Sequence, residues 1–145
     1  MNHGGKGWQN MKILIDTNII LDILLGRIPF SEEAEKLLEK IENNGLNGFI
    51  TANSVTDIVY VAKKQYSFEE IKTVMLNLIK IIKVISVNEH DIIEAFGMGF
   101  KDFEDALQYQ CASKTKLDYI VTRNEKDFKL SKIPVISIVE LLNLL

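Results

Sequence analysis

KILIDTNIILD, residues 12–22, places an apolar run of strand length directly before an acid, with a hydroxyl and an amide behind it. Asp16 therefore falls at the carboxyl end of a buried strand, where open α/β sheets bind their ligands. A buried carboxylate is unfavourable there unless a cation or a hydrogen-bond network meets it. The segment thus indicates a sheet of buried strands and a site at its edge.

The composition fits one globular domain with its own core. The chain has 145 residues, of which 47% are hydrophobic and 26% are charged. No apolar run is long enough to span a bilayer, no segment has the pattern of a signal peptide, and the single cysteine, Cys111, suits a reducing compartment. We therefore expect a cytoplasmic protein. The net charge of −3 argues against binding nucleic acid by bulk electrostatics alone.

The chain alternates between strand-like and helix-like segments after a short N-terminal extension. Residues 1–10 show no periodicity, and we interpret them as a disordered, appended or upstream extension, with residues 11–145 as a single domain. The alternation predicts an α/β fold with a parallel sheet that is covered on both faces. Strands are predicted over 13–16, 48–51, 83–87, 118–122 and 134–137. Helices are predicted over 17–25, 54–65, 88–95, 102–114 and 138–145, and after the caps Ser31 and Ser67.

Further polar residues stand at positions comparable to that of Asp16. Asp57 follows the second strand, Asp102 and Asp105 begin a helix, and Asn124 and Asp127 follow the fourth strand. Helices that follow parallel strands start at one edge of the sheet, so these side chains are expected to gather there.

Each of these acids also has a simpler explanation. Asp102 and Asp105 have the spacing of an N-cap and an N3 acid, and Ser54 and Asp57 have the same spacing. Such acids gain about 0.3–1 kcal/mol from the helix dipole. Taken together, however, the carboxylates would repel one another, and a divalent cation removes that repulsion. Hard oxygen ligands select Mg²⁺ or Mn²⁺, and ions held in this way serve phosphoryl chemistry.

Other chemistries fit the sequence poorly. It contains no Gly-rich phosphate loop, no Walker lysine motif and no G-x-S-x-G elbow. No Cys/His pair has the spacing of a zinc site. His90 is expected to be exposed in the first turn of a helix, and Cys111 to be a partly buried helical thiol. Water is therefore the expected attacking group.

Three segments in order resemble the PIN-domain ribonuclease family, which includes the VapC-type toxins of toxin–antitoxin pairs. They are ILIDTNIILD at 13–22, DFEDAL at 102–107 and DYIVTRNEKDF at 118–128. The resemblance covers residues 11 to about 144. It implies a three-layer α/β/α domain with a central parallel sheet of four or five strands.

The resemblance also implies roles for the acids. Asp16 matches the first metal ligand of the family. Asp57 falls where the family usually places a glutamate, and its shorter side chain reaches one methylene less. Asp105 matches the third acid, and Asp102 is an added acid seen in some branches. Asp16, Asp57 and Asp105 are the expected catalytic residues, and all four are expected metal ligands.

The last segment supplies the more variable part of the pattern. Asn124 and Asp127 match the last metal-ligand position, where neutral Asn124 would hold a metal-bound water and Asp127 would supply the charge. Thr122 resembles the hydroxyl that orients Asp16 or the metal, and a helix cap is an equally good interpretation. Asn18 is expected to brace the loop behind Asp16. Arg123 would either hold a phosphate of the RNA or be a solvated charge at a helix end.

The sequence therefore predicts an Mg²⁺- or Mn²⁺-dependent endoribonuclease, with an antitoxin as a separate chain if the protein is a toxin. Two alternatives stay open: a PIN-like binding module that has lost catalysis, and a nuclease or phosphatase with another substrate. The helix over 17–25 and the helix over 68–78 carry more apolar side chains than one face needs, so we also expect a homodimer.

Overall fold

The computed structural model of the chain describes residues 10–145, so the interpretation of residues 1–10 as an extension falls almost wholly outside the described residues. Strands and helices alternate, as predicted. In chain order they are β1 (Lys12–Ile15), α2 (Thr17–Leu24), α3 (Phe30–Asn44), β2 (Asn47–Thr51), α4 (Ala52–Ala62), α5 (Phe68–Ile81), β3 (Lys83–Ile85), α6 (Glu89–Phe96), α7 (Phe103–Lys114), β4 (Tyr119–Val121), the 3₁₀ helix η1 (Glu125–Phe128), β5 (Val135–Ile136) and α8 (Ile138–Leu144).

The five strands form one parallel sheet in the order β3-β2-β1-β4-β5. β1 lies at the centre, where Ile13 pairs with Gly48 of β2 on one side and with Tyr119 of β4 on the other. The chain fills the sheet from β1 toward β3 and then crosses back to β4, so β1 and β4 flank the point where the strand order reverses. Ligands bind at such a point in open α/β sheets.

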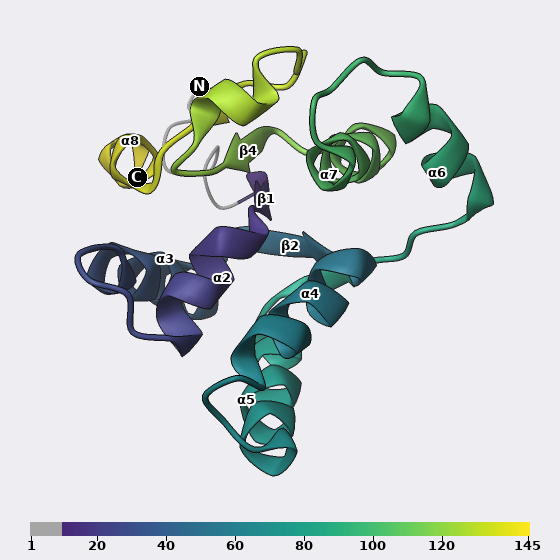
Figure 1. The fold of residues 1–145 in the computed structure, drawn as a ribbon. Helices are drawn as coiled ribbons and strands as arrows, with labels where there is room; N and C mark the ends of the chain where they lie inside the picture. Colours follow the sequence, from purple (N-terminus) through teal and green to yellow (C-terminus); the bar gives the residue numbers. More distant parts are fainter. Residues whose placement is uncertain (1–9) are drawn as a thin grey trace.

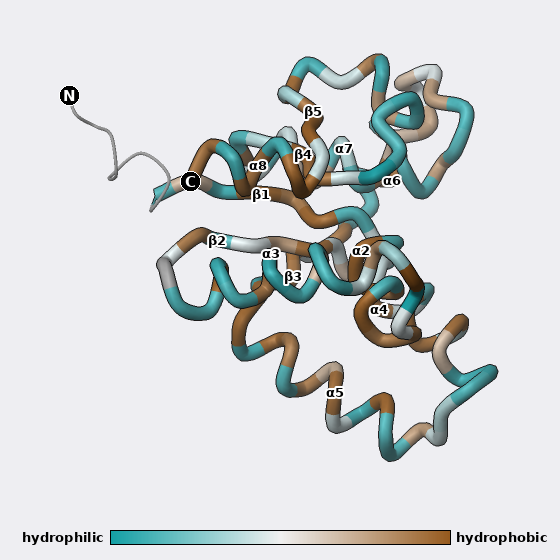
Figure 2. Tube along the Cα trace, turned by 90° about the vertical axis from the view of Figure 1, so that its left-hand side faces the viewer, coloured by the Kyte–Doolittle hydropathy of each residue, from teal (hydrophilic) through white to brown (hydrophobic). Residues whose placement is uncertain are grey.

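Helices cover both faces of the sheet, which confirms the three-layer α/β/α prediction. Ile13 and Ile15 of β1 share a buried cluster with residues from α2, α3, α4, α5 and α8, while Leu14 packs with Cys111 of α7 on the opposite face. Figure 1 shows α6 and α7 grouped apart from α2–α5. The strands carry mostly hydrophobic residues along their length (Figure 2), as expected for a sheet that is buried on both faces.

Most predicted helix starts are confirmed, and two are wrong. Ser67 and Asn88 each form a capping box at the start of α5 and α6. Ser31, however, lies inside α3, which begins at Phe30. Ser54 lies inside α4, whose N-cap is Thr51. A hydroxyl before an apolar pattern is a common start signal, but both of these helices begin before the serine.

Within residues 10–145, no helix is long and apolar enough to cross a membrane.

Candidate metal-binding site

Acidic side chains from four separate segments lie near one another at the carboxyl edge of the sheet. Burial, followed by the charges of Asp102, Asp16 and Asp127, raises the pKa of Asp105 to about 7. Burial and the charge of Asp102 raise the pKa of Asp57 on α4. These electrostatic effects place Asp16, Asp102 and Asp127 near Asp105, and Asp57 near Asp102. The structure thus brings together the acids that the sequence places far apart.

Asp16 is the most enclosed of these acids, with 3% of its surface exposed. Gln108 Nε2 donates to Oδ1 at 3.1 Å and Thr122 Oγ1 donates to Oδ2 at 2.9 Å. Burial raises the pKa of Asp16, and these two hydrogen bonds oppose that rise. Asp16 occupies the N-cap position of α2 but makes no capping hydrogen bond with its side chain. Its carboxylate is therefore oriented toward the site and does not serve as a helix cap.

Besides orienting Asp16, Thr122 also holds the segment after β4 in place. Its Oγ1 accepts a hydrogen bond from the Asn124 backbone N–H at 3.1 Å, and the Asn124 carbonyl accepts one from the Asp127 backbone N–H at 3.0 Å. Asn124 and Asp127 are both exposed, and Asp127 lies in η1. The hydroxyl thus combines the orienting role and a local turn role, which the sequence leaves as alternatives.

A buried cluster of hydroxyl groups joins three neighbouring segments behind the acids. Ser54 Oγ lies 2.6 Å from Thr17 Oγ1 and 2.9 Å from Thr51 Oγ1, and all three residues are buried. Thr17 directly follows Asp16, whereas Ser54 stands three residues before Asp57 on α4. The cluster therefore fixes the start of α4, and with it Asp57, relative to the end of β1.

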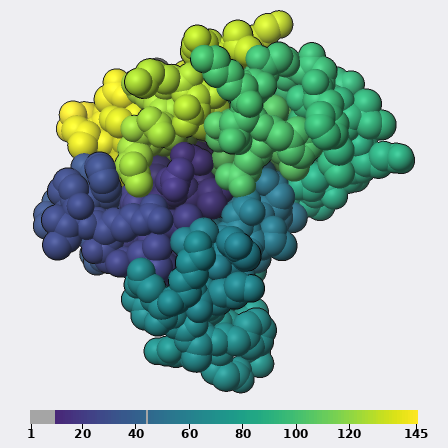
Figure 3. All heavy atoms as spheres, in the orientation of Figure 1, coloured from purple at the N-terminus to yellow at the C-terminus, as the bar shows by residue number. Residues whose placement is uncertain are grey.

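The start of α7 presents two acids to a cleft. Asp102 is the N-cap, and its Oδ1 accepts a hydrogen bond from the Asp105 backbone N–H at 3.0 Å, so the N-cap and N3 spacing is confirmed. Both acids line a cleft of about 510 Å³ together with three lysines. Figure 3 shows the N-terminal segment, in purple, recessed between α7 and the segment that follows β4. The lysines of the cleft are Lys101, Lys126 and Lys129.

The donors at this edge fit a hard divalent cation. They are carboxylate and amide oxygens, which Mg²⁺ and Mn²⁺ prefer, and their mutual repulsion favours a cation. The Oε1 atom of Gln108 is buried with no hydrogen-bond partner among residues 10–145, and so is Oδ1 of Asn53, one turn before Asp57 on α4. In this part of the chain, no three Asp, Glu, His or Cys side chains already stand at the spacing of a complete ion site.

The profile of the PIN domain matches residues 12–126. The chain belongs to the PIN domain family. Ribonuclease VapC1 of Aquifex aeolicus (strain VF5) is 28% identical to it over 131 residues, which cover 87% of this chain and 90% of that protein. A toxin-antitoxin complex from Klebsiella pneumoniae has a TM-score of 0.66 at 25% identity, covering 87% of this chain and 97% of that one. VapBC2 from Rickettsia felis, bound to a DNA fragment from its promoter, has a TM-score of 0.68 at 14% identity, covering 88% and 98%.

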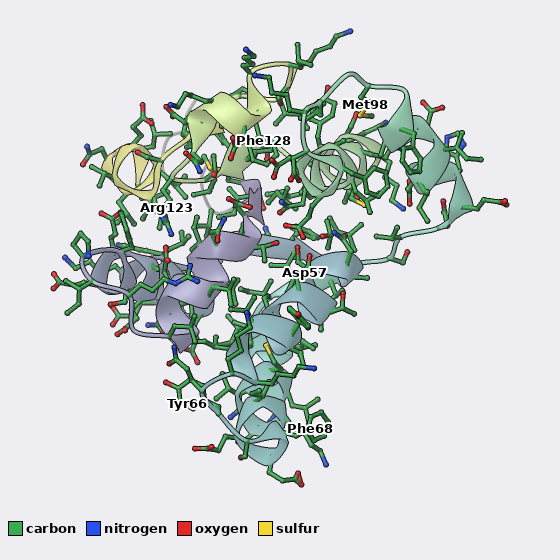
Figure 4. All side chains as sticks on the ribbon, in the orientation of Figure 1. Asp57, Tyr66, Phe68, Met98, Arg123 and Phe128 are labelled. Carbon is green, nitrogen blue, oxygen red and sulfur yellow. The ribbon has the colours of Figure 1, made fainter. Side chains whose placement is uncertain are left out.

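The two arginines of this PIN domain meet at a buried acid that the sequence does not single out. Asp22 on α2 receives hydrogen bonds from Arg123 Nε at 2.9 Å and Arg123 Nη2 at 3.1 Å, and a longer contact from Arg27 at 3.4 Å. The Arg123 guanidinium also lies over the Phe30 ring, 4.1 Å from its centroid. Arg123 stands on the α3 side of the site and Asp57 on the α4 side (Figure 4). Arg123 thus supports the segment after Thr122 through an ion pair.

Other expected residues of the PIN domain lie as follows. Asn18 is exposed in the first turn of α2 and has no hydrogen-bond partner among residues 10–145, so its side chain does not brace the loop. His90 is exposed, as expected. Cys111 is fully buried, and burial raises the pKa of its thiol to about 11, which fits a structural role.

The sequence pattern does not reveal two features of the site, Gln108 and the lysines of the cleft. A lone glutamine inside a helix gives no periodic signal. Lys101 comes from the loop before α7, Lys126 lies in η1 and Lys129 directly follows it, so only the fold brings the three together.

Proposed function

We propose that this PIN domain is a metal-dependent endoribonuclease that acts in the cytoplasm. The observation that carries the proposal is the geometry of Asp16, a buried carboxylate with one hydrogen-bond donor on each oxygen, beside Asp105, whose pKa is raised to about 7 by burial and three neighbouring acids. Without a cation this arrangement of carboxylates is unfavourable, and a bound divalent cation would offset their repulsion. The similarity to a protein named Ribonuclease VapC1 supports RNA as the substrate.

Asp16 and Asp105 would hold Mg²⁺ or Mn²⁺, with Asp57, Asp102, Asn124 and Asp127 as further oxygen ligands. A bound ion of this kind supplies an activated water and stabilises the leaving oxygen of a phosphodiester.

The side chains of the chain itself prepare this site. Thr122 and Gln108 fix both oxygens of Asp16, so the carboxylate needs little rearrangement to bind an ion. Lys101, Lys126 and Lys129 line the cleft next to the acids, where ammonium groups can contact phosphates on either side of the cleaved bond. A cleft lined by both acidic and basic side chains suits a substrate that carries a phosphate backbone.

The test compares Asp16→Asn with Asp118→Asn on a defined RNA in the presence of Mn²⁺. Asp118 stands just before β4, at the opposite end of the sheet, where it accepts a hydrogen bond from the Lys12 backbone N–H at 2.8 Å. We expect Asp16→Asn to fold and to lose metal-dependent cleavage, and Asp118→Asn to keep it. Cleavage by Asp16→Asn at the wild-type rate, or wild-type cleavage that persists in EDTA, would refute the proposal.

A PIN domain that only binds a partner or RNA is the second candidate, favoured by the neutral Asn124 and the short Asp57. Metal titration separates the two candidates. An intact site gains about 2.7 kcal/mol of stability when the free ion reaches 100 times its dissociation constant. A thermal unfolding midpoint that does not move with Mn²⁺ would favour the binding module. Activity on a panel of RNA, DNA and phosphomonoester substrates tests the alternative that the protein is a nuclease or phosphatase with another substrate.

We further propose that the protein is a toxin with a separate antitoxin chain, since structures of toxin–antitoxin complexes share its fold.

We also propose a homodimer. α5 exposes several large apolar side chains, and its groove with α2 includes Ile23, Leu24 and Ile71. Size-exclusion chromatography with light scattering at micromolar concentration tests this, and a monomer would refute it. The exposed apolar side chains of α5 are Phe68, Val74, Leu76 and Ile79.

A further inference from the structure

Gln108 is a fully buried amide in the middle of α7 that contacts the most enclosed acid of the site. It has no exposed surface, and its Nε2 donates to Asp16 Oδ1 at 3.1 Å. The other end of the same amide, Oε1, has no hydrogen-bond partner within the described residues. Buried amide oxygens are almost always paired, so an unpaired one next to a carboxylate calls for a functional explanation.

The orientation of the amide follows from its neighbour. With Nε2 toward Asp16, a donor meets a carboxylate oxygen, whereas the flipped amide would set two acceptors against each other. Because Nε2 and Oε1 share one carbon atom, the unpaired oxygen stays beside Asp16. The amide therefore presents one donor to the carboxylate and one free acceptor close to it.

We propose that Gln108 is a positioning residue for the divalent ion, which fixes Asp16 through Nε2 and offers Oε1 as an acceptor for a water bound to that ion. This inference rests on the proposed metal-dependent function. Partners that hold a metal ligand in place raise metal affinity because the ligand is oriented before the ion arrives. The free oxygen extends the same effect to the water shell of the ion, since coordinated water is a strong hydrogen-bond donor.

The same helix provides a matched control. Gln110 is also buried on α7, and its Nε2 also donates to an aspartate oxygen at 3.1 Å, that of Asp91. Asp91 lies in the first turn of α6, where it completes the capping box with Asn88, and it pairs with Lys114. The two glutamines therefore make equivalent hydrogen bonds, one to the proposed ion site and one to a purely structural ion pair.

The experiment compares Gln108→Met with Gln110→Met in the full chain. Methionine keeps the length and flexibility of glutamine and removes both hydrogen-bonding groups. Mn²⁺ affinity is measured by calorimetry well below the unfolding midpoint, and RNA cleavage is measured across a range of Mn²⁺ concentrations. We expect Gln108→Met to weaken Mn²⁺ binding by about tenfold or more, to lower kcat at limiting Mn²⁺ with the KM for RNA unchanged, and to recover at high Mn²⁺. Gln110→Met is expected to lower the unfolding midpoint and to bind Mn²⁺ like the wild type.

Gln108→Glu tests the acceptor separately. It keeps an oxygen beside Asp16 and adds a negative charge, so we expect lower stability without an ion and a larger upward shift of the unfolding midpoint with Mn²⁺ than in Gln108→Met.

Equal Mn²⁺ affinity in wild type and Gln108→Met, or equal weakening in the Gln110→Met control, would overturn the inference while leaving the proposed function intact. Equal Mn²⁺ shifts in Gln108→Glu and Gln108→Met would overturn the acceptor role of Oε1. A wild-type protein that binds no Mn²⁺ would overturn both the inference and the proposed function.

Discussion

Replacing Arg123 with methionine should destabilise the fold far more than the same change at Arg27, although both arginines contact Asp22. Arg123 makes two hydrogen bonds to Asp22, at 2.9 and 3.1 Å, and lies over Phe30. Asp22 has 1% of its side chain exposed, so its charge depends on these partners. Arg27 contributes a single contact at 3.4 Å.

The magnitude follows from burial. Removing one partner of a fully buried pair costs about 3–5 kcal/mol. Because 31% of the Arg123 side chain is exposed, solvent screens part of the ion-pair interaction. We therefore expect Arg123→Met to lower the free energy of unfolding by about 2–3 kcal/mol. The long contact of Arg27, which is 34% exposed, predicts a loss of less than about 1 kcal/mol for Arg27→Met.

Urea unfolding followed by circular dichroism measures both losses. With a slope of about 1–3 kcal/mol per molar urea, a loss of about 2–3 kcal/mol should lower the midpoint of Arg123→Met by about 0.7–3 M, and Arg27→Met should lower it by less. Asp22→Asn combined with Arg123→Met should cost less than the sum of the two single changes, because the two residues share one interaction. Equal, small losses in both arginine variants would refute the reasoning. A raised KM for RNA with an unchanged urea midpoint would instead assign Arg123 to the substrate.

Three further predictions concern the core. Burial raises the pKa of Cys111 to about 11, so we expect Ellman's reagent to label it at pH 8 only after unfolding; rapid labelling of the native protein would contradict this. Burial raises the pKa of Asp91, but hydrogen bonds from its partners outweigh that effect and leave it lowered. Its contribution to stability is therefore complete above its unfolded value of about 3.9 and disappears as pH falls through the lower folded value. Asp91→Asn should accordingly be less stable than the wild type at pH 7 and approach it in acid, as urea midpoints across pH would show. A Cβ on Gly48 would lie 2.8 Å from Ile41 Cδ1 and 3.2 Å from Ile15 Cδ1. We therefore expect Gly48→Ala to lower the free energy of unfolding by about 1–3 kcal/mol, measured by thermal unfolding. An unchanged unfolding midpoint would show that Ile41 and Ile15 can move aside without a measurable cost.

The sequence predicts those parts of the site in which strand, acid and helix start are adjacent along the chain. Asp16 directly follows β1, and Asp102 caps the helix that carries Asp105, so local patterns place all three. Parallel topology then predicts that they share an edge, because strands of one direction end together. The wrong cap at Ser54 belongs to the same class of signal, and there the hydroxyl is used by tertiary contacts to Thr17 and Thr51.

The interactions that hold Asp16 are not visible in local patterns. Its donors Thr122 and Gln108 are 106 and 92 residues away, and Asp22 is 101 residues from Arg123. Nothing in the spacing of a buried glutamine or a helical aspartate distinguishes it from a surface residue. Such partners are specified only when the sheet order has brought β4 and α7 beside β1.

Two buried glutamines on α7 show how polar residues can fix the position of a helix in a core. The helix is buried on two sides, against the sheet and against α6, and each side carries one glutamine that donates to a buried aspartate. Gln108 faces Asp16 and Gln110 faces Asp91, so a rotation or a shift of the helix along its axis would break both bonds and remove one hydrogen-bond donor from each buried carboxylate. Apolar packing alone tolerates such shifts better, because it is not directional. The two glutamines therefore fix the position of α7, and since Asp105 stands at its head, they also fix where that acid meets Asp16.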